Sequence, residues 1–366
     1  MQASARIGFS RLLARYALIA NSVPAADEAV RLSPSDPDAH RTRAVVLTRQ
    51  QQPAEAVKSL EAATSLRYRD DYLWLDLGNA REEVGDTAGA LAAFDQAVRW
   101  APHYAHTHWQ RGNLLLRMGR TAEAFSELRR AADTNKRYLP NLIDLAFGIS
   151  GKDVRTAEEL IQIRDDTERL AFMQFLTEAR AFKGAYAVWS RIEPVKSSQR
   201  GLFNGGFEEE LLLKGSAFGG WILSPEKNSN RLAIDISEKF AGTRSLQINF
   251  AGNWTPGTPL LSQTVLVEPS KTYRVSVSLK TKDLVTGGAP LFTVNDATNN
   301  QLLGKSENFP STNSWLTLSF EFTTLATSEA AVIRLQRNNC EQSPCPIFGV
   351  LWLDEIAIEQ TKPTTN

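Results

Sequence analysis

Two cysteines are the residues of this chain whose type and spacing most directly suggest a chemical bond. Cys340 and Cys345 are the only cysteines among the 366 residues, and four residues separate them. Two thiols cannot supply the four ligands of a structural zinc site, whereas neighbouring cysteines can close a small loop. We predict a disulfide, which suits an oxidising compartment. The alternative is a pair of reduced thiols in a cytosolic loop.

The four histidines could serve a metal site or a catalytic base, but their positions argue against both. They are His40 and the three histidines of the segment HYAHTH, at positions 103, 106 and 108. This segment spans a turn and the start of a helix, which does not place the rings on one face. The second half of the chain has no histidine, which removes Ser–His and Cys–His nucleophiles from it. No catalytic residue is predicted.

Charge and hydropathy exclude two classes of partner. The 41 basic residues equal the 41 acidic ones, and a chain without net charge has no field that attracts nucleic acid. No apolar stretch is long enough to span a membrane. The first 20 residues, interrupted by Arg6, Arg11 and Arg15, favour an amphipathic helix over a signal peptide. An export signal or membrane anchor is therefore either absent or encoded outside this sequence.

The first half of the chain repeats every 34 residues. The small residues that recur at this spacing are Gly78 and Gly112, Ala90 and Ala124, and Ala97 and Ala131. Such a period predicts two antiparallel helices per unit, with small residues where the helices touch. The unit at 71–102 resembles the tetratricopeptide repeat at Trp74, Leu77, Gly78, Ala90, Phe94, Ala97 and Pro102. The units at 37–70 and 105–138 match less fully, and the latter has His108 in place of the tryptophan.

We expect this helical domain to cover residues 1–193 and to bind a partner. Stacked repeats leave a concave groove, lined by the first helix of each unit. Tyr72, Asn79, Trp109 and Asn113 lie on these first helices, and the two asparagines could hold the backbone of an extended peptide. The alternative is that the asparagines only follow the consensus of the repeat.

After about residue 201 the apolar residues alternate with polar ones. The alternating segments include RSLQINF, LLSQTVLV, KTYRVSVSLKT, SWLTLSFEFTT and GVLWLDEIAIE. Eight or nine such strands without intervening helices predict an antiparallel sandwich. The predicted fold class is therefore an α-solenoid of helical hairpins, followed by an all-β jelly-roll sandwich at 201–360. We expect residues 194–201 to be a short connection between halves that fold separately.

The order of motifs in this second half resembles the jelly-roll carbohydrate-binding modules, which have a galactose-binding-like fold. The motifs are NGGFE at 204–208, GW at 220–221, AGTRSLQI at 241–248 and WLDEI at 352–356. The resemblance implies a structural calcium ion held by Glu208 and Asp354, with the carbonyl of Gly206 and one from the turn at 239–245. Calcium takes six to eight oxygen ligands. The alternative is a Glu–Asp corner satisfied by Arg or water; Glu355 is expected to point outward.

The same resemblance implies aromatic rings that stack on sugars. Trp254 follows a strand and lies among Gly, Asn and Pro, so we expect its ring to be exposed. Phe292 could supply a second platform, with Gln263 and Asn295 as polar partners. The alternative for Trp254 is a ring folded back on the sheet. Four other aromatics lie in apolar alternation and are expected in the core: Trp221, Trp315, Trp352 and Tyr273.

These inferences favour an exported, non-enzymatic adaptor. Its repeats would bind a protein or peptide and its sandwich a polysaccharide, as in bacterial polysaccharide assembly or export. The expected location is periplasmic or extracellular, with any membrane anchor in a segment outside this sequence. Two alternatives remain: a scaffold that binds only proteins, and a carbohydrate-active enzyme.

Overall fold

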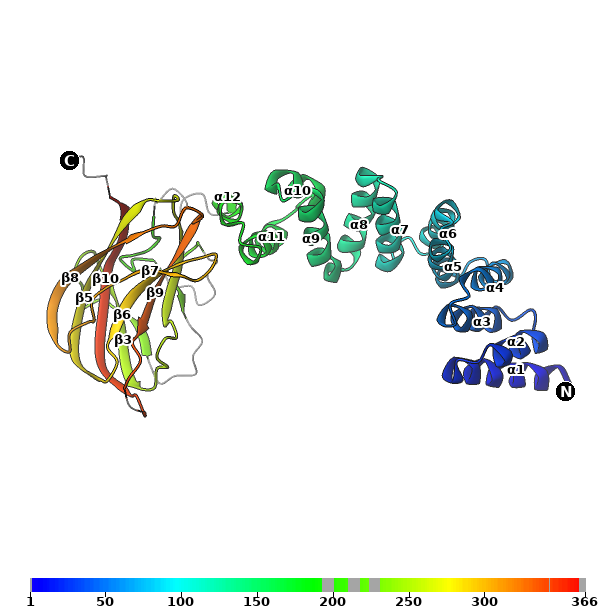
Figure 1. Ribbon diagram of the computed structural model, residues 1–366, viewed down its shortest axis with the longest axis horizontal. Helices are drawn as coiled ribbons and strands as arrows, with labels where there is room; N and C mark the ends of the chain where they lie inside the picture. The colour runs from blue at the N-terminus through cyan, green and yellow to red at the C-terminus, as the bar shows by residue number, and fades with distance from the viewer. Residues whose placement is uncertain (1, 193–200, 210–217, 224–230, 342, 362–366) are drawn as a thin grey trace. The chain divides into compact units, whose positions relative to one another are not determined.

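The computed structural model describes residues 2–192, 201–209, 218–223, 231–341 and 343–361 (Figure 1). The chain divides into two compact units, Met1–Ile163 and Arg164–Asn366. The predicted connection at 194–201 lies, except for Gly201, outside the described residues. Among the described residues no helix is long and apolar enough to cross a membrane.

The first unit is built from antiparallel helical pairs (Figure 1). Its helices are α1 (Gln2–Ala20), α2 (Val23–Leu32), α3 (Pro37–Arg49), α4 (Pro53–Leu66), α5 (Asp71–Glu83), α6 (Thr87–Trp100), α7 (Ala105–Arg117), α8 (Thr121–Thr134), the short η1 (Lys136–Tyr138), α9 (Leu139–Ile149) and α10 (Val154–Ile161). Several begin at a side-chain cap: Asp36, Asp70 and Asp86 each accept a hydrogen bond from a backbone N–H of the first turn, which satisfies a donor that the helix leaves free.

The recurring glycines lie where paired helices touch. A Cβ atom on Gly78 of α5 would overlap the ring of Phe94 on α6, and one on Gly112 of α7 would lie 2.7 Å from Cγ of Leu128 on α8. Both contacts are closer than real Cβ atoms permit. The spacing of small residues therefore identified the helix contacts correctly.

The second unit contains two helices, α11 (Asp166–Glu178) and α12 (Phe182–Ile192), and a sandwich of two antiparallel sheets. One sheet has the order β1-β4-β9-β6-β7 and the other β2-β3-β10-β5-β8. The strands are β1 (Ile222–Leu223), β2 (Arg231–Asp235), β3 (Ser245–Gly252), β4 (Leu261–Leu266), β5 (Thr272–Thr286), β6 (Pro290–Asp296), β7 (Leu302–Lys305), β8 (Asn313–Thr323), β9 (Ala330–Arg337) and β10 (Ile347–Gln360). The predicted fold class is confirmed.

Strand β10 lies between β3 and β5 and sets the two faces of its sheet. Leu351 and Leu353 are completely buried in the core between the sheets, so the alternate residues Trp352 and Asp354 lie on the opposite side, called here the outer face. An irregularity between Asp354 and Ala357 adds one residue to β10. Glu355 occupies it with a φ of 46°, in the left-handed region where bulge residues are found.

The joints between helical pairs share one hydrogen bond. In three successive repeats a ring nitrogen lies 2.7–2.9 Å from the backbone carbonyl six residues earlier. The pairs are His40 with Pro34, Trp74 with Tyr68, and His108 with Pro102. His108 thus replaces the repeat's tryptophan without loss of this contact.

His108 also makes a second, charged contact. Its Nδ1 lies 2.6 Å from Oε2 of Glu127, and both side chains are almost fully buried. The hydrogen bond to Glu127 raises the pKa of His108 against the opposing effect of burial. Burial works to raise the pKa of Glu127, but His108 and the guanidinium groups of Arg111 and Arg130 outweigh it, so this pKa is lowered. Both ring nitrogens face acceptors, which favours the imidazolium form.

We predict that the helical unit loses stability as the solution becomes alkaline. A pKa raised by folding stabilises the fold fully below the unfolded value, near 6.5, and this contribution disappears as pH rises through the folded value. Thermal melting followed by circular dichroism at 222 nm between about pH 6 and pH 9 should show a falling midpoint. His108→Gln should flatten this profile and cost about 1–3 kcal/mol, because Oε2 of Glu127 loses a charged, buried donor.

The matched control is His103→Gln, because His103 is exposed in the adjoining turn and makes neither contact. It should retain the wild-type profile. A wild-type midpoint that is constant over this range would contradict the prediction.

Candidate functional site

Trp254 does not present its ring to solvent. It is 2% exposed and stacks on Phe250 with the ring centroids 5.4 Å apart. Its indole N–H donates to the carbonyl of Thr258 at 2.9 Å, so the loop folds back on the core. The expectation of an exposed platform at Trp254 is therefore wrong, and the alternative stated for it holds.

The other three residues expected to contact sugar are not brought together. Phe292 is completely buried and Gln263 is 1% exposed. The side-chain amide of Gln263 accepts a hydrogen bond from the backbone N–H of Phe203 at 2.6 Å and donates one to the backbone carbonyl of Phe203 at 2.8 Å. Asn295 donates to the carbonyl of Asn300 and closes the turn between β6 and β7. These side chains serve the fold, because each has an internal partner.

Of the two further tryptophans expected in the core, Trp352 is buried, but on the outer face of its sheet, and Trp315 is half-buried on that face. Trp352 pairs across the sheet with Gln247 and Lys280, whereas Trp221 and Tyr273 do belong to the core cluster. In SWLTLSFEFTT, Trp315 shares its phase with Thr317, Ser319 and Glu321, while the intervening apolar residues pack on the core. Phase within the strand was thus the signal that the prediction missed.

The half-buried Trp315 and the exposed Phe240 form an aromatic surface on the outer face. Their ring centroids are 5.9 Å apart and their ring planes meet at 55°. Phe240 is 48% exposed. Trp352 lies deeper, at 7% exposed, with the ammonium of Lys280 5.4 Å from its ring centroid. Lys280 also pairs with Glu238 at 2.7 Å. We call Phe240 and Trp315 the aromatic platform.

A loop at 236–244 carries Phe240, and Asp235 anchors the start of this loop. One carboxylate oxygen of Asp235 accepts from Ser237 and Glu238, and the other from the indole of Trp352 at 2.9 Å. The hydrogen bonds from Ser237 and then Trp352 hold the pKa of Asp235 well below its usual value. Asp235 is therefore ionised throughout the neutral range and ties the loop to the outer face.

Two further carboxylates hold the end of the same loop. Oδ2 of Asp354 accepts from the backbone N–H groups of Phe240 at 2.9 Å and Ala241 at 3.0 Å. Oε1 of Glu208 accepts from the N–H of Thr243 at 2.7 Å, and Oε2 from its hydroxyl. These bonds, first of all that from the Thr243 hydroxyl, lower the pKa of Glu208. The predicted corner of Glu208, Asp354 and the turn at 239–245 therefore assembles, and it positions Phe240.

The corner offers some of the oxygen ligands that a hard cation needs. Oδ1 of Asp354 accepts one hydrogen bond, from the N–H of Glu355, and retains a second lone pair. A Cβ atom on Gly206 would lie 3.7 Å from this oxygen and 3.0 Å from Oε1 of Glu355. Glu355 was expected to point away; its left-handed backbone turns its carboxylate toward Gly206. Nevertheless, within the described residues no three His, Cys, Asp or Glu side chains are arranged to hold a metal ion.

The residues expected to bind a partner lie on α5 and α7, as placed by the repeat. Tyr72 is 49% exposed, with its ring centroid 5.6 Å from that of Tyr104, and Trp109 stacks on Tyr138 at 4.8 Å. Asn79 lines a groove of about 290 Å³ together with Val45, Thr48, Arg49, Asp76 and Glu83. Asn113 is half-buried on α7. The partner contacts themselves stay a prediction.

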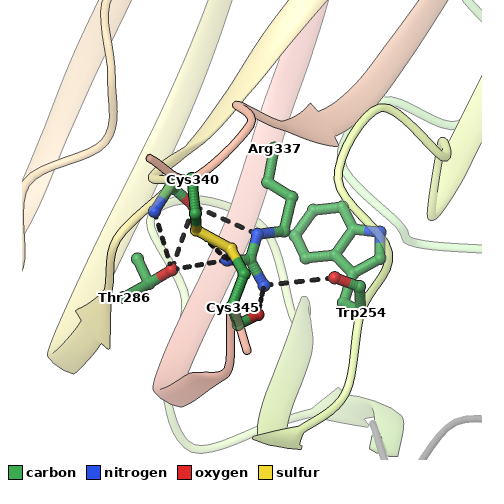
Figure 2. The surroundings of a disulfide bond; sticks show 6 residues. Trp254, Thr286, Arg337, Cys340 and Cys345 are labelled. Atoms are coloured by element: carbon green, nitrogen blue, oxygen red, sulfur yellow. Dashed lines mark hydrogen bonds between the residues drawn. A yellow bond between two sulfur atoms is a disulfide. The ribbon is translucent and has the colours of Figure 1, made fainter. Parts of the chain in front are cut away.

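The predicted disulfide between Cys340 and Cys345 is present. Figure 2 shows the guanidinium of Arg337 beside it, directed at the carbonyls of Trp254 and Cys345 and at the hydroxyl of Thr286. The cysteine loop is thus fixed to two other segments of the sandwich.

Comparison with known families agrees with this architecture. Residues 11–70 and 75–138 match the family model described as a tetratricopeptide repeat, and residues 200–342 match that described as a carbohydrate binding domain. The chain therefore contains tetratricopeptide repeats within residues 11–138 and a domain of the carbohydrate-binding-module kind at 200–342. Repeats of this family bind proteins and such modules bind carbohydrate; neither is a catalytic kind of domain.

Individual relatives are distant. Protein FlbA of Caulobacter vibrioides is 28% identical over 98 residues, which are 27% of this chain and only 16% of FlbA. Among solved structures, MamA is 15% identical (38% of this chain, 82% of that one, TM-score 0.35). PilF of Pseudomonas aeruginosa is 18% identical (53% and 94%, TM-score 0.38). A structure of a CBM4 module is 14% identical (44% and 99%, TM-score 0.33).

We predict that truncation of Trp254 and of Trp315 destabilises the sandwich to very different extents. Trp254→Ala should lower the free energy of unfolding of the sandwich by about 3–5 kcal/mol, because it empties a packed site. Trp315→Ala should cost about 1 kcal/mol or less, because its ring lies on the outer face. Equilibrium denaturation of the two variants by guanidinium chloride measures both values. Equal losses would show that Trp315 is a core residue after all.

Proposed function

We propose that the protein is a non-enzymatic adaptor, which holds a polypeptide in the groove of its repeats and a glycan on the outer face of its sandwich. The observation that carries the proposal is the aromatic platform. Trp315 and Phe240 leave the core and lie side by side on a polar face, although both rings would gain free energy from burial. Such exposure of adjacent aromatic residues is typical of a binding surface.

The surroundings of the platform support a polyhydroxylated ligand. Lys280, which lies over the ring of Trp352, forms a compensated pair with Glu238 of the Phe240 loop, and the hydroxyls of Thr317 and Ser319 continue along β8 on the same face. Aromatic rings can stack on the apolar face of a sugar while adjacent polar groups bind its hydroxyls. Small-ligand sites generally combine an apolar surface with a few orienting polar groups in this way. The absence of a net charge in this pair favours a neutral glycan over a polyanion.

The groove of the first unit supports the protein-binding half of the proposal. Asn79 lies within it beside Asp76, Arg49 and Glu83, so both donors and acceptors are available to a peptide backbone. Tyr72 lies on α5, which lines this groove, and Trp109 lies on α7, outside it. An extended segment crossing α5 and α7 could use all of these side chains.

Export and a role in polysaccharide assembly belong to the same proposal. The disulfide favours an oxidising compartment, which would be the periplasm or the exterior. A glycan-binding domain joined to a protein-binding array could bring an assembly protein to a polysaccharide. A scaffold that binds only proteins is the competing function.

We also propose that calcium binds the corner of Glu208 and Asp354. Oδ1 of Asp354 and Oε1 of Glu355 lie near Gly206, the carboxylate of Glu208 holds the adjoining turn, and Arg244, 3.8 Å from Glu208, is a nearby cation. This excess of negative charge favours a divalent ion with oxygen ligands. Bound calcium would strengthen the attachment of the Phe240 loop.

For the platform we predict a dissociation constant on the order of 10–100 µM for a neutral oligosaccharide, because few polar contacts are buried. Phe240→Ala and Trp315→Ala should each weaken binding at least about tenfold, as measured by calorimetry with a glycan selected on a broad array. Leu302→Ala is the control, because Leu302 is 51% exposed on β7 of the other sheet. If the wild type binds nothing on the array, the protein-only scaffold becomes the better account.

For the corner we predict that calcium raises the melting temperature of the sandwich relative to chelator, because it binds only the folded form. Glu208→Gln should remove this shift and leave melting of the helices unchanged. Differential scanning calorimetry of both proteins tests this. An identical melting curve with calcium and with chelator would mean that N–H donors alone satisfy the corner.

A further inference from the structure

A second cleft lies in the sandwich where the cysteine loop meets the turn after β5. It has a volume of about 600 Å³, within the range of small-ligand sites. We call it the end cleft. Its lining includes the amides of Asn308, Asn338 and Asn339, the ring of Phe348 and the backbone of Gly288. None of these residues belongs to the aromatic platform.

A buried arginine fixes the walls of the end cleft. Arg337 is 1% exposed and donates to the carbonyls of Gly288 at 3.2 Å and Cys345 at 3.0 Å, and to the hydroxyl of Thr286 at 2.8 Å (Figure 2). Burial lowers the pKa of its guanidinium. Among the described residues no carboxylate forms an ion pair with it. Its hydrogen bonds go to neutral acceptors. They join the turn that carries Thr286 and Gly288 to the cysteine loop, so one side chain connects the two walls of the cleft.

Two glycines let the cysteine loop approach the opposite wall. A Cβ atom on Gly288 would collide with the carbonyl of Asn338, and one on Gly287 would lie 3.2 Å from Sγ of Cys340. The disulfide then holds the loop at this distance. The shape of the cleft is therefore established before any ligand binds, which reduces the entropy lost on binding.

The asparagine side chains offer both donors and acceptors. Nδ2 of Asn338 donates to Oδ1 of Asn308 at 2.7 Å. This bond orients both amides and leaves the NH₂ group of Asn308 and the carbonyl oxygen of Asn338 for a ligand. Hydroxyl groups, which donate and accept, match such a pair better than a charged group does.

An apolar surface borders these amides. Phe348 is 48% exposed, and Val285, its neighbour across β5 and β10, is 66% exposed. Phe348 lies four residues from Trp352 along β10, a span of about 13 Å at the rise of a strand. Phe348 is thus set apart along β10 from Trp352, which does not line the end cleft.

We propose that the end cleft is a second carbohydrate site, which takes one terminal pyranose of a neutral glycan. The ring of Phe348 covers the apolar face of the sugar, and Asn308 and Asn338 bind its hydroxyls. The walls made by the disulfide loop and the Gly287–Gly288 turn limit the site to the end of a chain. The proposal extends carbohydrate binding to a second place and does not rest on the platform.

The test uses the full chain labelled with ¹⁵N at asparagine, and methyl glycosides of neutral pyranoses as probes. One glycoside should shift the side-chain amide signals of Asn308 and Asn338 in NMR spectra. Phe348→Ala and Asn308→Ala should each weaken this binding at least about fivefold, by loss of about 1 kcal/mol. Replacing both cysteines with serine should have a similar effect, because the wall is released.

Phe240→Ala is the matched control, because it removes an equally exposed ring outside the cleft. It should leave the glycoside titration unchanged while it weakens binding of the oligosaccharide at the platform. The proposal is overturned if no glycoside of the panel shifts these amides, or if Phe348→Ala and Asn308→Ala bind as the wild type does. Either result leaves the platform untouched, so the two sites fail separately.

Discussion

Strand β10 is hydrogen-bonded to β3 on one side and to β5 on the other, and the site depends on this double pairing. A central strand cannot slip by one residue without turning every side chain to the other face. Burial of Leu351 and Leu353 therefore commits Trp352 and Asp354 to the outer face. Asp354 in turn holds the loop that carries Phe240. The packing of the core thus fixes the positions of the outer-face side chains, because both depend on the register of β10 with β3 and β5.

The helical repeats could be predicted from the sequence because their signals are local. Gly78 and Gly112 recur at a fixed spacing. Only glycine fits at either position, because a side chain of the paired helix leaves no room for a Cβ atom. The disulfide was predictable for the same reason, since the two cysteines are close in the chain. By contrast, the bond between His108 and Glu127 joins two helices, and no local pattern indicates it.

The candidate site was harder to predict because a strand pattern shows two faces but does not say which one a loop will cover. Trp254 appeared exposed in its loop, yet Arg337, 83 residues away, binds its carbonyl and helps to hold the loop on the core. Trp315 appeared apolar by its neighbours, although its phase placed it with Thr317 and Ser319. A family motif, rather than periodicity, pointed to Glu208 and Asp354; both bind the loop at 236–244, and calcium between them stays a prediction.

The extra residue at Glu355 also limits how this domain can change during evolution. Before it, even-numbered residues of β10 face outward; after it, Ile356 packs in the core and Ile358 against it. Substitutions on the outer face can alter ligand preference while the pairing stays intact. Deletion of Glu355 itself would remove the bulge and leave Asp354 and Ile358 on their present faces, whereas deletion of a residue beside it would bring Asp354 into the core or Ile358 into solvent. Homologues with new specificities should therefore differ in the side chains of β10 and, apart from the bulge residue, keep its length.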